Sequence, residues 1–318
     1  VVTAQDRDLI DTWMRGHRVW TFRRVVHYRM MWRVRSWTES RLPASLRWAS
    51  LKALAATDLW AMLMGALRLA WLVRRRRVDL IHLNNGFTPP EAFLAARLTD
   101  IPCVVHLRGF PDADRKPTER AKRWIEPVAH VIAVSEAVAA DLEKKDLVAS
   151  DRIVAIHNPV DLKATARAMV ERDRIRRKYG LEPRHVAIGI FGRVMEWKGQ
   201  AIFVEAAIRA MRRNPDIRAF IVGDESDGAR DYVERISEMI RESGMQDSFR
   251  LTGYTPDVEA YFAAMDMVVH ASIAPEPFGR VLPEAMAARR VIIAADAGGP
   301  REVISHGHDG LLVPPGDV

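Results

Sequence analysis

Apolar residues recur along the chain in two alternating patterns. From residue 79 onward, short and nearly continuous apolar runs are separated by segments in which apolar residues recur every three or four positions. Continuous short runs are typical of parallel strands that are buried on both faces. The expected strands are 79–85, 101–109, 130–136, 152–158, 185–194, 218–224, 249–254, 267–272, 290–296 and 310–315. Expected helices at 91–98, 200–213 and 231–243 lie between them, and this alternation predicts doubly wound α/β domains.

The strand series is interrupted between residues 157 and 184. The turn-forming sequence His-Asn-Pro-Val-Asp is followed there by a highly charged helical segment, residues 163–180. We therefore predict two Rossmann-like domains, residues 1–165 and residues 166–318, which face each other across a cleft at the carboxyl ends of their strands.

The first quarter of the chain has a different character. Residues 42–77 show helical periodicity, but the apolar stretch 59–73 contains Arg68 and is shorter than the roughly 20 residues that a membrane span requires. We expect a packed or interfacial helix. Residues 1–50 fit either strand or helix, and a solvated basic face over an ordinary core element is an alternative interpretation of them.

Positive charge and tryptophan are concentrated in the same region. Residues 1–77 contain 16 Lys and Arg against 5 Asp and Glu, whereas the whole chain carries a net charge of only +7. Seven of the nine tryptophans also lie there. Basic side chains interleaved with tryptophan suit an anionic membrane surface, so peripheral membrane contact through residues 1–77 is expected. Nucleic acid is the other polyanion to consider.

Composition limits the remaining possibilities. Hydrophobic residues make up 48% and charged residues 28%, as in ordinary globular proteins. The single cysteine, Cys103, excludes an internal disulfide and a cysteine-based metal site, and its apolar surroundings predict a buried thiol in a reducing, cytoplasmic setting. The start of the chain has no signal-peptide pattern, and because it opens on valine we expect the natural start to be missing.

The most informative stretch is residues 274–301, with Glu276 and Glu284 at its centre. Pro283 suits the first position of a helix, which places Glu284 in the first helical turn and Glu276 in the preceding loop. Free amides at such a helix start can bind phosphate, and the two carboxylates can bind hydroxyl groups. A nucleotide sugar would satisfy all of these groups. The alternative is that both glutamates are ordinary surface acids.

A second candidate site is residues 189–207. A predicted strand ends at Gly192-Arg193, Lys198-Gly199 follows in a short loop, and a helix begins after it. An arginine and a lysine at such a junction can clamp a diphosphate, although both could instead belong to a solvated loop. Asp-x-Asp spacings occur only at residues 6–8 and 112–114, and neither clearly follows a strand. We therefore predict no metal and no cofactor other than the donor substrate.

Both motifs resemble those of retaining glycosyltransferases of family 4, which have the two-domain GT-B fold. The sequence Glu-Pro-Phe-Gly-Arg-Val-Leu-Pro-Glu from Glu276 to Glu284 carries the resemblance, together with Gly-Arg and Lys-Gly at residues 192–199. It implies that Glu276 lies by the donor sugar and Glu284 binds the ribose. It also implies that the amides of Val281 and Leu282 meet the diphosphate.

The resemblance implies further site residues. His106, at the end of a strand in the first domain, would reach the donor sugar together with Glu276, although a lone histidine there also suits a core position. His82, Asn84 and Asn85 are weaker candidates on the acceptor side. The remaining donor-binding candidates are Gly192, Arg193, Lys198, Gly253, Tyr254, Phe278 and Gly279.

The expected function is transfer of a sugar, with retention, from a nucleotide-diphosphate sugar to a saccharide or lipid-linked acceptor hydroxyl. Synthesis of an envelope glycan or exopolysaccharide on the cytoplasmic face of a membrane is the expected setting. A nucleotide-sugar epimerase of GT-B-like fold and a catalytically degenerate binding module are the alternatives, while a nucleic-acid binder would leave the donor-site motifs unexplained. The resemblance extends over residues 78–318 and lacks the family's first strand and last helix, so a chain truncated at both ends is expected.

Overall fold

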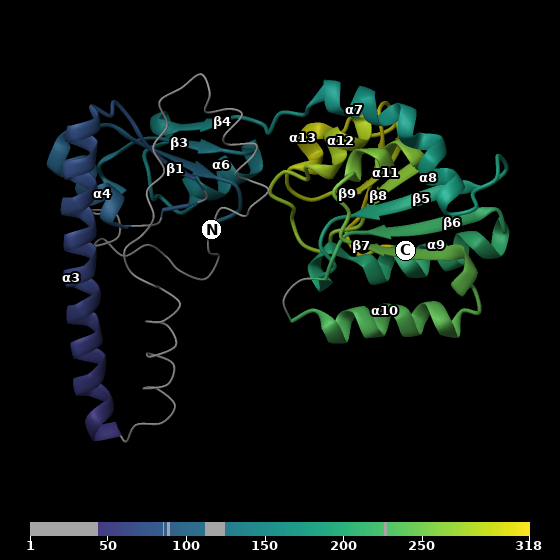
Figure 1. Ribbon diagram of the computed structural model, residues 1–318, viewed down its shortest axis with the longest axis horizontal. Helices are drawn as coiled ribbons and strands as arrows, with labels where there is room; N and C mark the ends of the chain where they lie inside the picture. The colour runs from purple at the N-terminus through teal and green to yellow at the C-terminus, as the bar shows by residue number, and fades with distance from the viewer. Residues whose placement is uncertain (1–43, 85, 88–89, 112–124, 226–227) are drawn as a thin grey trace. The chain divides into compact units, whose positions relative to one another are not determined.

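The computed structural model describes residues 44–84, 86–87, 90–111, 125–225 and 228–318, with side chains in the first helix described from Thr57 onward. All ten predicted strands are present, and they form two sheets (Figure 1). The first sheet has the order β1-β2-β3-β4, and the second has the order β10-β9-β8-β5-β6-β7. The first contains β1 (Ile81–Asn84), β2 (Cys103–Leu107), β3 (Val128–Ala133) and β4 (Ile153–Ala155). The second contains β5 (Val186–Phe191), β6 (Ile217–Val222), β7 (Phe249–Gly253), β8 (Met267–His270), β9 (Val291–Ala295) and β10 (Leu311–Val313).

The helices agree with the predicted segments in most places. The early helices are α3 (Ala44–Arg76), α4 (Pro90–Thr99) and α6 (Glu136–Lys144). The later ones are α9 (Gln200–Arg213), α10 (Arg230–Glu242), α11 (Val258–Ala264), α12 (Val281–Ala287) and α13 (Pro300–Val303). The charged segment that we predicted as one helix is instead two short helices, α7 (Leu162–Ala168) and α8 (Arg172–Lys178), joined by a 3₁₀ turn at Met169–Glu171.

By their contacts the residues form two compact units. The first includes α3, most of β1, α4 and the start of β2, and the second includes residues 130–318 together with residues 84–86 and 105–122. Among the helices of the described residues, none combines the length and apolarity needed to cross a bilayer.

The second sheet has the strand order of a dinucleotide-binding fold. Counted from β5, its order is 3-2-1-4-5-6, and the strand pairs are parallel. In this topology the chain adds β6 and β7 on one side of β5 and then β8, β9 and β10 on the other side. Ligands of such sheets bind in the crevice outside the carboxyl ends of the strands that correspond to β5 and β8.

Both faces of the second sheet are buried, which explains the continuous apolar runs in the sequence. Ala187 and Phe191 on β5 belong to the core beneath α8, α11 and α12, while Ile188 and Ile190 belong to the core beneath α9 and α10. Alternate residues of the strand thus serve opposite layers. Cys103 is fully buried in β2, as predicted, and burial raises the pKa of its thiol to about 11.

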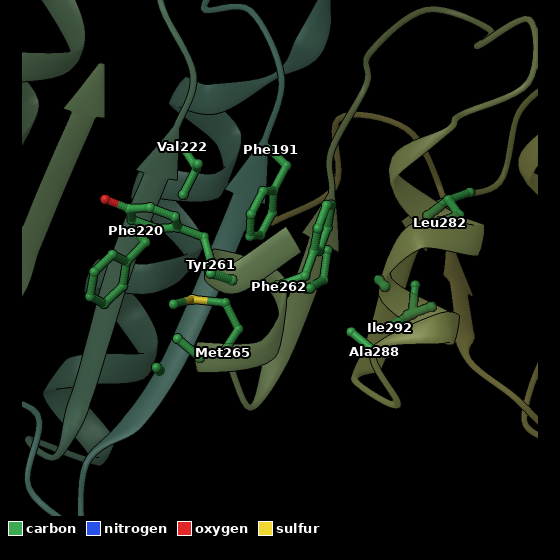
Figure 2. Packing of buried hydrophobic residues seen from close by; sticks show 14 of the residues in the cluster. Phe191, Phe220, Val222, Tyr261, Phe262, Met265, Leu282, Ala288 and Ile292 are labelled. Carbon is green, nitrogen blue, oxygen red and sulfur yellow. The ribbon is translucent and has the colours of Figure 1, made fainter. Parts of the chain in front are cut away.

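Two stacked rings join α11 to the centre of the sheet. The ring centroids of Phe191 and Phe262 are 3.9 Å apart and the ring planes differ by 12°. Figure 2 shows these rings side by side, with Met265 beneath Tyr261 in the same cluster. Phe262 is 1% exposed, so its whole side chain contributes to the core.

Replacing Phe262 by alanine should therefore destabilise the protein strongly. We expect the free energy of unfolding to fall by about 3–5 kcal/mol, because the ring leaves a cavity that the sheet cannot close. Urea unfolding followed by circular dichroism measures the change. Val170→Ala is the control, since that side chain is 79% exposed and its truncation should change little. Equal effects of the two substitutions would contradict this description of the core.

Candidate active site

The candidate site lies at the carboxyl ends of β5 and β8, the two neighbouring strands between which the strand order of the second sheet reverses. β5 and β8 are neighbours, with Ile190 paired to Val269, so the loops that follow them leave the sheet side by side. The loop after β5 contains Lys198, and the loop after β8 contains Glu276. The Ile273 amide donates a hydrogen bond to the Trp197 carbonyl at 2.9 Å, which ties the two loops together.

Two glycines let these loops approach closely. Gly199 has a φ of +72°, and a Cβ atom there would lie 1.9 Å from the Ala271 carbonyl oxygen. Gly298 has a φ of +75°, and a Cβ atom there would lie 2.3 Å from the Glu276 carbonyl oxygen. A larger residue at either position would push the Glu276 segment away from its neighbours.

Three side chains converge on one oxygen of Glu276. Lys198 Nζ donates to Glu276 Oε2 at 2.6 Å, and Ser272 Oγ donates to the same atom at 3.1 Å. His270 Nε2 lies 3.4 Å from Oε2 and 3.2 Å from Ser272 Oγ. We call Lys198, His270, Ser272 and Glu276 the Glu276 cluster. Within the part of the chain that the structure describes, its hydrogen bonds to the carboxylate all end on Oε2, which leaves Oε1 available to accept from a ligand.

The cluster keeps Glu276 ionised although it is buried. Burial alone would raise the pKa of this carboxyl, but the contact with His270 and the charge and hydrogen bond of Lys198 outweigh it and lower the pKa to about 2. At neutral pH Glu276 is therefore a carboxylate that only accepts hydrogen bonds. It is suited to binding hydroxyl groups rather than to donating a proton.

His270 is oriented by the same contacts. It is 4% exposed, and its Nδ1 atom is buried without a hydrogen-bond partner among the described residues. A proton on Nε2 can be donated to Glu276 or Ser272, whereas a proton on Nδ1 would have no acceptor. We therefore place a proton on Nε2.

The second predicted carboxylate lies in α12, as expected, but in a different environment. Glu284 Oε1 accepts from Arg280 at 2.9 Å. Burial raises the pKa of this carboxyl, against the opposing charge of Arg280. The prediction that Pro283 opens the helix is wrong, because α12 begins at Val281 and Pro283 is its third residue. Glu284 still belongs to the first turn. Proline has no backbone N–H, and in the first turn its absence costs no hydrogen bond within the helix.

The turn between the two glutamates is well packed. Phe278 is 4% exposed, Leu282 is fully buried, and Gly279 has a φ of +81°. The Leu282 amide already donates to the Gly279 carbonyl at 2.9 Å. The amide of Val281, the first residue of the helix, has no partner within the helix, as is general for that position.

The remaining donor-side candidates lie at the ends of β5, β6 and β7. Arg193 is exposed, and its carbonyl accepts from Gln200. The Gly192 amide donates to Val222 at 2.9 Å. Gly253 lines a small cavity of about 140 Å³ with Asp224 and Glu225, and Tyr254 just beyond it is 56% exposed. None of these residues contacts Glu276 through a hydrogen bond in the described part of the chain.

The candidates of the first sheet lie on β1 and β2 and directly after them. His106 lies on β2, and it is not among the hydrogen-bond partners of Glu276 found in the described residues. Asn84 accepts a hydrogen bond from Arg108 at 2.7 Å, and His82 is exposed on β1. Asn85 and the Asp-x-Asp spacings at residues 6–8 and 112–114 lie outside the described residues. In the residues that are described, no group of His, Cys, Asp and Glu is arranged to hold a metal ion.

Comparisons with known proteins find matches over both halves of the chain. A family model for glycosyl transferases group 1 matches residues 185–318, and a model for glycosyltransferase family 4 matches residues 14–164. The lipopolysaccharide core biosynthesis mannosyltransferase LpcC of Rhizobium leguminosarum is 30% identical over 81% of this chain and 69% of its own length.

The chain belongs to glycosyltransferase family 4.

Two further relatives support the family and the fold. A D-inositol 3-phosphate glycosyltransferase of Pseudarthrobacter chlorophenolicus is 33% identical over 76% of this chain and 61% of its own length. The crystal structure of Anabaena HepE in complex with UDP-glucose is 27% identical, with a TM-score of 0.66 over 79% of this chain and 68% of that one. The predicted family and GT-B architecture of this family 4 glycosyltransferase are thereby confirmed.

Sequence reasoning did not identify two members of the Glu276 cluster in this glycosyltransferase. His270 and Ser272 end the predicted strand 267–272, next to the motif that begins at Glu276. Their position at the carboxyl end of a strand was the available signal. Their convergence on the carboxylate depends on the loop path, which the strand pattern does not specify.

The lowered pKa of Glu276 predicts a specific acid sensitivity. The ordinary pKa of the group is 4.5 and the folded value is about 2, so its contribution to stability is complete above pH 4.5 and is lost as the pH falls toward 2. Through this group the unmodified protein should lose up to about 3 kcal/mol of its free energy of unfolding over that interval. Glu276→Gln has no such group and should not show this part of the loss. Urea unfolding at a series of pH values measures it. Glu205→Gln on α9 is the control, and an unchanged acid slope in Glu276→Gln would refute the assignment.

Proposed function

We propose that the chain provides the donor-binding and catalytic site of a retaining sugar transferase that uses a nucleotide-diphosphate sugar. The observation that carries the proposal is the buried, ionised Glu276, held through Oε2 by Lys198 at the carboxyl ends of β5 and β8. A carboxylate with one oxygen fixed and the other available suits recognition of sugar hydroxyls. The neighbouring cation suits a phosphate.

We assign the donor diphosphate to Lys198 and Arg193. Lys198 Nζ bonds to Glu276, while Arg193 is exposed in the same loop after β5. These positive charges would stabilise the leaving nucleoside diphosphate as negative charge develops on it. The Val281 amide would add a donor to the same phosphates, and the Leu282 amide would have to leave its bond to Gly279 to do so.

We assign the sugar and the nucleoside to separate carboxylates. Glu276 would accept from hydroxyl groups of the donor sugar, and Glu284 would accept from the ribose. Gly192, Gly253, Tyr254, Phe278 and Gly279 would shape the donor pocket, and His106 would orient the sugar from the first domain. Residues 166–318 would then form the donor side and residues 1–165 the acceptor side.

The acceptor is proposed to be a saccharide or lipid-linked glycan at the cytoplasmic face of a membrane. The basic and tryptophan-rich character of residues 1–77 supports this setting. The name of the Rhizobium relative refers to lipopolysaccharide core biosynthesis, which is consistent with an envelope glycan.

Release of nucleoside diphosphate from UDP-, GDP- and ADP-sugars, with and without membrane extract, tests the transfer reaction. One donor should support release, and Glu276→Ala should lower turnover by about 10²–10³-fold, the usual effect of losing one buried electrostatic contact with the transition state. Glu205→Ala is the matched control, because that glutamate is an exposed partner of Arg209 on α9.

Other outcomes would indicate a different function. Full turnover in Glu276→Ala would refute the assigned site. Conversion of the donor without any acceptor would indicate an epimerase, and nucleotide binding without release in any condition would indicate a degenerate binding module.

A further inference from the structure

Helix α3 exposes a stripe of large apolar side chains. Trp60, Met64, Leu67 and Trp71 are 66%, 47%, 54% and 55% exposed. Their spacing of four, three and four residues places them on one face of the helix. Leu63, which is 41% exposed, borders the same face. Scattered exposed apolar residues are normal, but a stripe along three helical turns indicates a binding surface.

The opposite side of α3 holds the helix in the fold. Gly65, Ala66, Ala70 and Val73 are buried there. Gly65 faces the Glu91 side chain of α4, where a Cβ atom would lie 3.5 Å from Glu91 Cγ. Figure 1 shows α3 as a long helix that extends well beyond the shorter α4. From Thr57 onward, the buried residues of α3 are therefore mostly small, and its larger apolar side chains face outward.

Positive charge continues the stripe at the carboxyl end of the helix. Arg74–Arg77 are all exposed, and the Arg75 guanidinium lies 4.9 Å from the centre of the Trp71 ring. Between residues 57 and 77 the chain has five arginines and one acid, Asp58. An open groove of about 530 Å³ is lined by Leu67, Ala70, Trp71, Arg74, Arg75 and Leu98. Apolar walls with two guanidinium groups suit a phosphate that carries an alkyl chain.

We propose that this face of α3, from Trp60 to Arg77, docks on an anionic lipid surface. The apolar stripe would enter the interface between headgroups and acyl chains, and the arginines would contact lipid phosphates. Charge favours this partner over a second copy, because two such faces would bring ten arginines together. The inference specifies the membrane partner of the proposed function, but lipid binding does not require transfer activity.

Sedimentation of the full chain with vesicles tests the proposal. We expect binding to phosphatidylcholine vesicles that contain about 30% phosphatidylglycerol to be at least about tenfold stronger than binding to phosphatidylcholine alone. Binding should weaken as salt rises, since exposed charges are screened. Quenching of tryptophan fluorescence by brominated lipid should show that the rings enter the bilayer, and Trp71→Phe should reduce it.

Matched substitutions separate this face from the general charge of the protein. Leu67→Glu should weaken binding to the anionic vesicles about tenfold, because it places a charge at the centre of the stripe. Leu162→Glu on α7 is the control, since Leu162 is 67% exposed and the exchange is identical. Arg68→Gln with Arg75→Gln should lower both the affinity and its salt dependence. Thermal unfolding of each variant checks that the fold is kept.

Several results would overturn the proposal. They are equal binding to neutral and anionic vesicles, unchanged binding by Leu67→Glu, and a dimer in solution that Leu67→Glu disrupts. Binding of RNA without binding of vesicles would assign the face to nucleic acid instead. Glu276→Gln should bind vesicles like the unmodified protein, so failure of the transfer assay and failure of docking can be told apart.

Discussion

The parallel pairing of β5 with β8 is the constraint on which the site depends. It brings together two loops whose key residues, Lys198 and Glu276, are 78 positions apart in the sequence. The loops touch backbone to backbone, through the Ile273 amide and the Trp197 carbonyl and through the contact that only a glycine at position 199 permits. The lysine and the carboxylate meet because the strand order reverses between β5 and β8, so that these two strands are neighbours. In sheets of this topology, ligands bind outside the carboxyl ends of these two strands.

Burial makes the members of the Glu276 cluster depend on one another. A buried carboxylate is costly unless it is paired, and removing one partner of a buried pair leaves an uncompensated charge. Loss of activity on truncation of Lys198 would therefore combine the loss of the proposed phosphate contact with a displaced Glu276. Ser272 and His270 lessen this dependence, because both also reach Oε2. Fixing one oxygen with several donors holds the other in place, and the proposed recognition of a sugar would use that preorganisation.

The sequence predicted the elements better than their arrangement. Continuous apolar runs identified all ten strands, because strands buried on both faces leave that pattern. The order β10-β9-β8-β5-β6-β7 depends on contacts between distant residues, which the strand pattern does not specify. The prediction that Glu276 lies in a loop and Glu284 in the first turn of a helix is confirmed. The roles of His270 and Ser272 could not be predicted, because a histidine or serine at a strand end gives no sign of where its side chain points.

Helix α3 shows the same limit of prediction from sequence. Its periodicity predicted a helix, yet every side of the segment carries apolar residues, so the pattern could not say which side is buried. The structure buries the small residues Gly65, Ala66 and Ala70 and exposes Trp60, Leu67 and Trp71. If a helix packs only against its own fold, its largest apolar side chains are expected to be the buried ones, because their transfer out of water contributes the most free energy. In the described part of the fold the helix packs against α4 with small residues and leaves larger apolar side chains exposed, which is the observation behind the proposed docking face.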